Sequence, residues 1–168
     1  MSVPPENAVV AVCNATADAE AVVTELCRQG LQPSCISVVA TDEQSRSAPI
    51  VLHSEPGGFR RAAHPGGWRL LEPLPGCAVL IGSGERMALL TGPFAASVAR
   101  MLDNQGLFGD LGPIAGGLYS LGIPREAACD YERTALRGCA LVIVHGRARD
   151  VARARLILAA RTESKLLA

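Results

Sequence analysis

The sequence predicts one α+β domain over residues 1–168, with a mixed β-sheet in a ferredoxin-like arrangement and an inserted helical segment. Three observations predict this class: the composition, a βαβ pattern at the N-terminus and a βα pattern at the C-terminus. A chain of 168 residues has the length of one domain. With 49% hydrophobic and 19% charged residues, it is not typical of a disordered protein.

The first 40 residues indicate a βαβ unit. The run AVVAVC at 8–13 is apolar and rich in β-branched valine, as in strands. Ala19, Val22 and Leu26 then recur at the spacing of one helix face, and Gly30 is expected to end that helix. The run CISVVA at 35–40 predicts the second strand.

The middle of the chain is less regular. Residues 41–76 are rich in turn-forming residues and predict a loop-rich insertion. Strand candidates lie at 50–52, 68–71, 77–82 and 87–90, and the last two flank a hairpin turn at 82–85.

Helices are expected after this hairpin. Residues 92–121 predict a helical hairpin region, with helices at 94–102 and 111–121. A further helix over 124–137 is expected to end at Gly138. The strand 139–145 and a last helix beginning near Asp150 form the C-terminal βα unit, which completes a sheet of roughly four to six strands.

The residue inventory excludes several enzyme classes, and we expect a non-enzymatic protein without cofactor or metal. Lys165 is the single lysine, so a Schiff-base lysine and a P-loop lysine are absent from plausible positions. The three histidines are far apart, and none belongs to an H-E-x-x-H motif. None of the six cysteines forms a C-x-x-C pair, so we interpret them as buried, reduced thiols.

Charge and hydropathy restrict the partners and the compartment. The net charge is zero and the aromatics number six, so we do not expect a nucleic-acid partner. The first residues do not resemble a signal peptide, and we identify no transmembrane segment. The sequence therefore predicts a cytoplasmic protein.

A stripe of small residues recurs every four positions within the expected helix 111–121. Its members are Gly112, Gly116 and Ser120. Small residues at this spacing let a second backbone approach closely. The stripe predicts either close helix packing inside the chain, self-association or contact with a membrane surface.

Basic residues gather at the C-terminal end. Residues 125–168 carry nine basic and five acidic side chains, and a cluster lies on and before the last helix: Arg147, Arg149, Arg153 and Arg155. The cluster is either a solvated helix face or a site for an anion, an anionic lipid surface or an acidic partner.

Two segments resemble bacterial general-stress-protein-like domains of the 17M type, a group of glycine-rich domains of unknown function. The first segment matches through Ala19-Glu20-Ala21-Val22, Leu26, Gly30 and Ile36-Ser37-Val38-Val39. The second matches through Gly122-Ile123-Pro124, Ala128, Tyr131-Glu132 and Gly138. The resemblance implies an α/β sandwich and an association with stress responses, and it implies no catalytic residues. The family's long Gly/Ala-rich central hairpin is replaced here by a shorter, charged segment.

Three function classes remain open from the sequence. The first is a non-enzymatic, stress-associated assembly or interaction protein that forms a homo-oligomer or a subunit of a larger complex. The second is a small-ligand-binding regulatory domain that uses the 41–76 region. The third is an enzyme.

Overall fold

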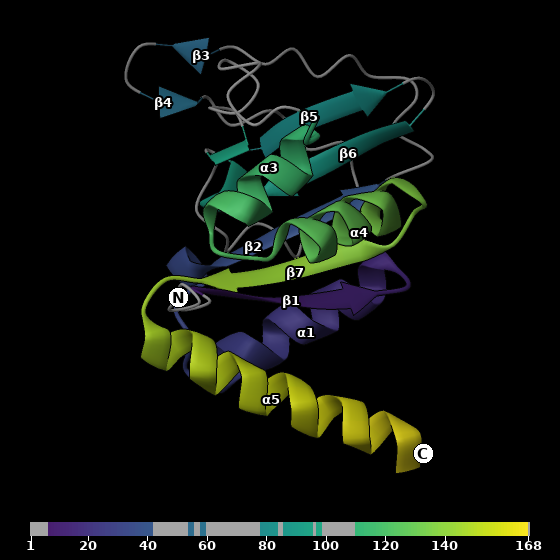
Figure 1. Ribbon diagram of the computed structural model, residues 1–168. Coiled ribbons are helices and arrows are strands. Elements are labelled where there is room, and N and C mark those ends of the chain that lie inside the picture. Colours follow the sequence, from purple (N-terminus) through teal and green to yellow (C-terminus); the bar gives the residue numbers. More distant parts are fainter. Residues whose placement is uncertain are drawn as a thin grey trace.

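Among the described residues, five strands form one β-sheet (Figure 1). The computed structural model describes residues 7–41, 54–55, 58–59, 78–83, 86–95, 97–98 and 110–167. In sheet order, the strands are β1 (Ala8–Cys13), β7 (Ala140–His145), β2 (Ile36–Thr41), β6 (Arg86–Thr91) and β5 (Ala78–Ser83). A separate short ladder pairs β3 (Ser54–Glu55) with β4 (Gly58–Phe59).

All four neighbouring pairs of this sheet are antiparallel, so the expectation of a mixed sheet was wrong. The reason lies in the two helical crossovers. β1 and β2 run parallel, but β7 lies between them, and β6 and β7 run parallel with β2 between them. Because each crossover skips one strand, parallel strands are never neighbours.

The α+β class, the N-terminal βαβ unit and the C-terminal βα unit are confirmed. The pairing of the two strands expected to flank the hairpin turn is also confirmed, because Ser83 at the end of β5 pairs with Arg86 at the start of β6. The ferredoxin-like arrangement is not confirmed. The last strand, β7, lies inside the sheet, and the first strand, β1, forms an edge.

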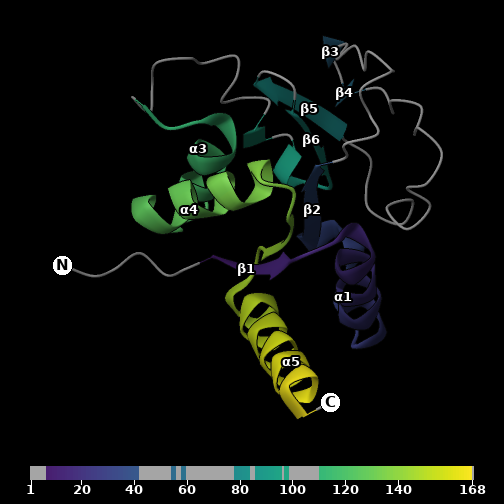
Figure 2. The same ribbon diagram turned by 90° about the vertical axis from the view of Figure 1, so that its right-hand side faces the viewer.

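Helices cover both faces of the sheet (Figures 1 and 2). α1 (Thr16–Arg28) and α5 (Ala148–Leu167) lie on one face, and α3 (Pro113–Ser120) and α4 (Arg125–Leu136) lie on the other. β7 is therefore buried on both sides: Val142 and Val144 face α1, and Leu141 and Ile143 face the opposite core. This explains why its sequence is a continuous apolar run.

The described helices match the sequence signals closely. Gly30 and Gly138 follow α1 and α4 with φ angles of 89° and 106°, as expected for glycines that end helices. In the expected 92–121 region, residues 94–95 and 97–98 are helical and α3 follows at 113–120. Residues 99–109, most of the 41–76 insertion and the strand candidates at 50–52 and 68–71 lie outside the described residues.

No helix in the described part of the chain combines the length and the apolar character that a membrane span requires.

Candidate functional site

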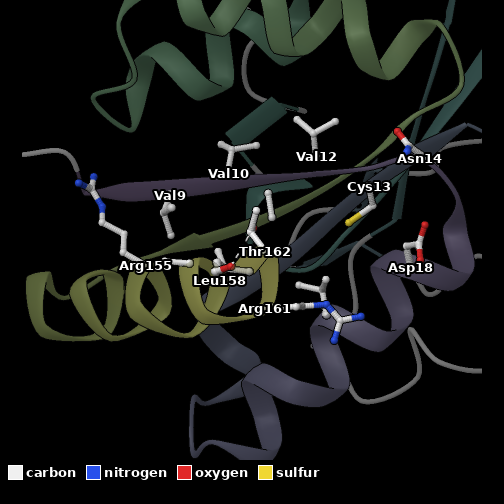
Figure 3. A pocket seen from close by; sticks show the side chains of 13 residues that line it. Val9, Val10, Val12, Cys13, Asn14, Asp18, Arg155, Leu158, Arg161 and Thr162 are labelled. Atoms are coloured by element: carbon white, nitrogen blue, oxygen red, sulfur yellow. Dashed lines mark hydrogen bonds between the residues drawn. The ribbon is translucent and has the colours of Figure 1, made fainter. Parts of the chain in front are cut away.

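A groove runs along the open edge of β1 (Figure 3). Within the described residues β1 pairs only with β7, so no described strand pairs with the backbone N–H and C=O groups on its other side. The groove has a volume of about 510 Å³ and is bounded by β1, by Val22 of α1 and by Leu158 of α5. We call it the edge groove.

The wall formed by β1 is apolar and accessible. Val12 is 47% exposed, and Val9, Val10 and Ala11 are half-buried. None of the six residues of β1 is charged and none is proline. A long apolar strand of this kind usually lies inside a sheet or has its edge covered.

The two ends of the edge groove carry opposite charges. Arg155 of α5 lies at the end near Val9, and Asp18 of α1 lies at the end near Cys13 (Figure 3). Arg161, which is half-buried, also lines the groove. Hydrogen bonds from Arg28 and Gln29 lower the pKa of the neighbouring Glu25 to about 2, and the positive charge of Arg161 adds to this effect.

A second groove, which we call the arginine groove, lies where β7 passes into α5. Its volume is about 710 Å³, and three of the four arginines predicted as a cluster line it: Arg147, Arg149 and Arg153. Arg155 lines the edge groove instead. All four arginines are exposed, as expected for a cluster on the solvent side of a helix.

Arg153 also has a structural contact that the sequence did not predict. Its guanidinium donates a hydrogen bond to the backbone carbonyl of Gln29, which lies at the end of α1. The same guanidinium covers Gly30, where a Cβ atom would lie 3.4 Å from Nη2. Arg153 therefore ties α5 to the C-terminal end of α1.

Nucleophilic side chains near the arginine groove are not activated for catalysis. Ser37 is fully buried, and its Oγ accepts a hydrogen bond of 2.9 Å from the backbone N–H of Phe94 and lies 3.4 Å from Nε2 of His145. The thiol of Cys35 donates to the carbonyl of Gln32, and burial raises its pKa. A buried hydroxyl and a protonated thiol are poor nucleophiles.

The three residues of the small-residue stripe lie in different surroundings. Gly112 precedes α3, Gly116 is buried within it and Ser120 is exposed at its end. Gly112 lies against the carboxylate of Glu132, and a further close approach involves Gly117, outside the stripe, where a Cβ atom would lie 2.8 Å from Cε2 of Phe94.

Sequence reasoning missed the role of Glu132, although it belongs to the matched Tyr131-Glu132 pair. Its Oε2 accepts hydrogen bonds from the backbone N–H groups of Ile114 (2.8 Å) and Ala115 (2.9 Å). A carboxylate of α4 thus caps the first turn of α3. An acidic residue eight positions after the proline of a Gly-Ile-Pro turn is the only local signal of this cap.

Comparisons with protein-family models, with curated proteins and with solved structures find no match to this chain. Within the described residues, acidic, histidine and cysteine side chains do not gather into a group that could hold a metal ion.

Proposed function

We propose that this chain is a non-enzymatic assembly protein that binds another protein along the open edge of β1. The observation that supports this proposal best is the edge groove, with its uncharged strand and unpaired backbone groups. Strand addition satisfies such backbone groups, and the neighbouring side chains supply specificity. The resemblance to general stress proteins suggests a bacterial, cytoplasmic and stress-related setting.

The physical argument rests on how proteins protect sheet edges. Edge strands are normally protected from pairing with other chains by charged residues, proline, a bulge or a covering element. β1 carries neither charge nor proline, and Val12 is 47% exposed. An accessible edge of this composition promotes aggregation unless a partner covers it, so a regular partner is the simplest explanation for its composition.

The test introduces one charge at the open edge of β1 in order to prevent strand addition there. In Val12→Lys, the lysine places a charge beside the unpaired edge and disfavours strand addition, while the half-exposed position tolerates the side chain. Ala160→Lys, an exposed position of α5 outside the edge groove, is the matched control. Circular dichroism and thermal melting verify that both variants fold.

The readout is the native mass of the assemblies that each tagged variant forms, both as purified protein and in the cells that produce it. We expect the parent and Ala160→Lys to form the same assembly and Val12→Lys to lose it. An assembly that survives in Val12→Lys, or a parent that has the monomer mass under both conditions, contradicts the proposal.

The arginine groove favours a second candidate function, the binding of a small anionic ligand. Arg147 and Arg149 are exposed beside the first turn of α5, and basic side chains at a helix N-terminus favour anions. Calorimetric titration with inorganic phosphate tests this function. Arg147→Gln with Arg149→Gln should abolish binding, whereas Arg133→Gln on α4 should not, and a parent without measurable binding excludes phosphate-like ligands.

A further inference from the structure

We propose that the partner of β1 is a second copy of this chain, joined by antiparallel pairing of the two β1 strands. This inference rests on the proposed function and names its partner. A two-fold axis perpendicular to the sheet would join the two five-stranded sheets into one continuous sheet across the dimer. Each β1 would then satisfy the outward backbone groups of the other.

The charges at the two ends of the edge groove are arranged so that they can pair with the charges of a second copy. Arg155 lies at the end where β1 begins, and Asp18 lies at the end where β1 finishes (Figure 3). In an antiparallel pair, the start of one strand lies beside the end of the other. Arg155 of each copy is therefore placed toward Asp18 of the other, and the two-fold axis creates this contact twice.

Between these two charges, the half-buried Val9 and Leu158 line the groove together with the polar side chains of Arg161 and Thr162 (Figure 3). Val10 and Val12 point toward the opposite face of the sheet, where Val12 is 47% exposed. Antiparallel pairing brings the valines of one β1 against those of the other, and β-branched residues pair favourably across strands. Apolar side chains with polar and charged residues around them are the usual anatomy of a protein interface.

A peptide from another protein would need its own matching charges, whereas a second copy supplies them automatically. Because the interface is self-complementary, every copy carries one Arg155 and one Asp18 at opposite ends. This property distinguishes a homodimer from capture of an unrelated strand.

Charge reversal gives a sharp test. Asp18→Arg carries positive charge at both ends of the groove, and Arg155→Glu carries negative charge at both ends. Each variant alone should dimerise about tenfold more weakly than the parent, because like charges meet twice. When the two variants are mixed, every contact joins opposite charges, so a heterodimer should form with an affinity close to that of the parent.

Mixing also separates this effect from damage within each chain. Both Asp18 and Arg155 have further interactions in their own molecule, and a substitution that only disturbed those would not be repaired by a second protein. Native mass measurement distinguishes the heterodimer from both homodimers, because the two variants differ in mass. Val12→Lys should be monomeric, and Ala160→Lys should dimerise like the parent.

Two results overturn the homodimer. One is a purified parent that stays monomeric at about 100 μM, a concentration at which even weak dimers are populated. The other is a mixture of the two variants that dimerises no better than either variant alone. If the homodimer is overturned but Val12→Lys loses an assembly that the parent forms in cells, the proposed function stands with a different partner. An assembly that survives in Val12→Lys contradicts both proposals.

Discussion

At the scale of single residues, one tightly packed position lies where β6 ends against β2. Gly92 has a φ angle of 90°, which is favourable for glycine and strained for other residues. A Cβ atom at this position would lie 2.7 Å from Oγ of Ser37 and 2.8 Å from its Cα, and would also meet the carbonyl oxygen of Ile36. Backbone atoms cannot move aside as the end of a flexible side chain can.

Gly92→Ala should therefore lower the free energy of unfolding by roughly 2–4 kcal/mol, through φ strain and the clash together. Gly30→Ala is the matched control. Its φ angle of 89° is nearly the same, but its nearest neighbours are guanidinium atoms of Arg153 at 3.4–3.8 Å. The variant Gly30→Ala should lower the free energy of unfolding by about 1 kcal/mol, from φ strain alone. Urea unfolding of both variants measures the difference, and equal losses would show that the contact with Ser37 has no effect.

The half-buried position of His145 predicts a pH dependence. Burial lowers its pKa from the ordinary value of 6.5, so on acidification the unfolded chain takes up this proton before the folded chain does. Stability contributed by this group is therefore present above the unfolded pKa and is lost as the pH falls through about 6.5. Arg147 and Arg149 line the same groove.

The variant His145→Gln removes this titration and keeps a polar side chain near Ser37. Urea unfolding at several pH values between about 8 and 5 should show a smaller loss of stability for the variant than for the parent. Parallel curves for the two proteins would mean that His145 has the same pKa in the folded and unfolded chains.

At the scale of elements, the α3–α4 hairpin depends on one carboxylate. α3 has eight residues and no side-chain cap from its own sequence, and so short a helix is marginal without tertiary contacts. Glu132 of α4 supplies the missing cap on Ile114 and Ala115. A Cβ atom at Gly112 would occupy the position of that carboxylate, so glycine is required there by the cap.

Glu132→Ala should cost about 1–2 kcal/mol of stability, and Glu132→Gln less, because the amide oxygen still accepts a hydrogen bond. Gly112→Ala should cost a similar amount by displacing the carboxylate. The two losses should not add, since both remove the same cap. Chemical unfolding of the double variant Gly112→Ala/Glu132→Ala tests this, and additive losses would mean that Gly112 acts independently of Glu132.

The sequence predicted the helices and strands better than it predicted which side chains pack against them. The stripe of small residues shows why. The four-residue spacing lies in a segment that is helical, as expected, but spacing alone does not specify which neighbour approaches. The contact with Phe94 and Val98 involves Gly117, and the cap from Glu132 involves Gly112. All three neighbours are more than 15 residues away along the chain from the glycine that they contact, so local periodicity carries no information about them.

At the scale of the whole molecule, the order of the strands in the sheet could not be predicted from the sequence. The expected strands 8–13, 35–40, 77–82 and 139–145 lie within one residue of β1, β2, β5 and β7. Yet β1 and β7 have similar apolar sequences, and one is an edge while the other is central. The edge groove exists only because β7, formed last along the chain, lies between β1 and β2. Its oppositely charged ends come from α1 and α5, which are distant in sequence.

The thiols give a last prediction for the intact molecule, namely that its stability does not depend on disulfides. The five described cysteines form no disulfide: Cys13, Cys27, Cys35, Cys129 and Cys139. Cys13 is buried against the α1 side of the sheet, and burial raises the pKa of both Cys27 and Cys35, which keeps these thiols protonated. They act as small apolar groups within regular elements.

A reductant should therefore shift the melting temperature by less than about 1 °C, whereas loss of a structural disulfide would cost about 2–5 kcal/mol and lower it by several degrees. Alkylation of the denatured protein without reductant provides the control, since it should add one adduct to each of the six cysteines. A clear fall in melting temperature, together with fewer adducts before reduction than after it, would show that a disulfide stabilises the fold.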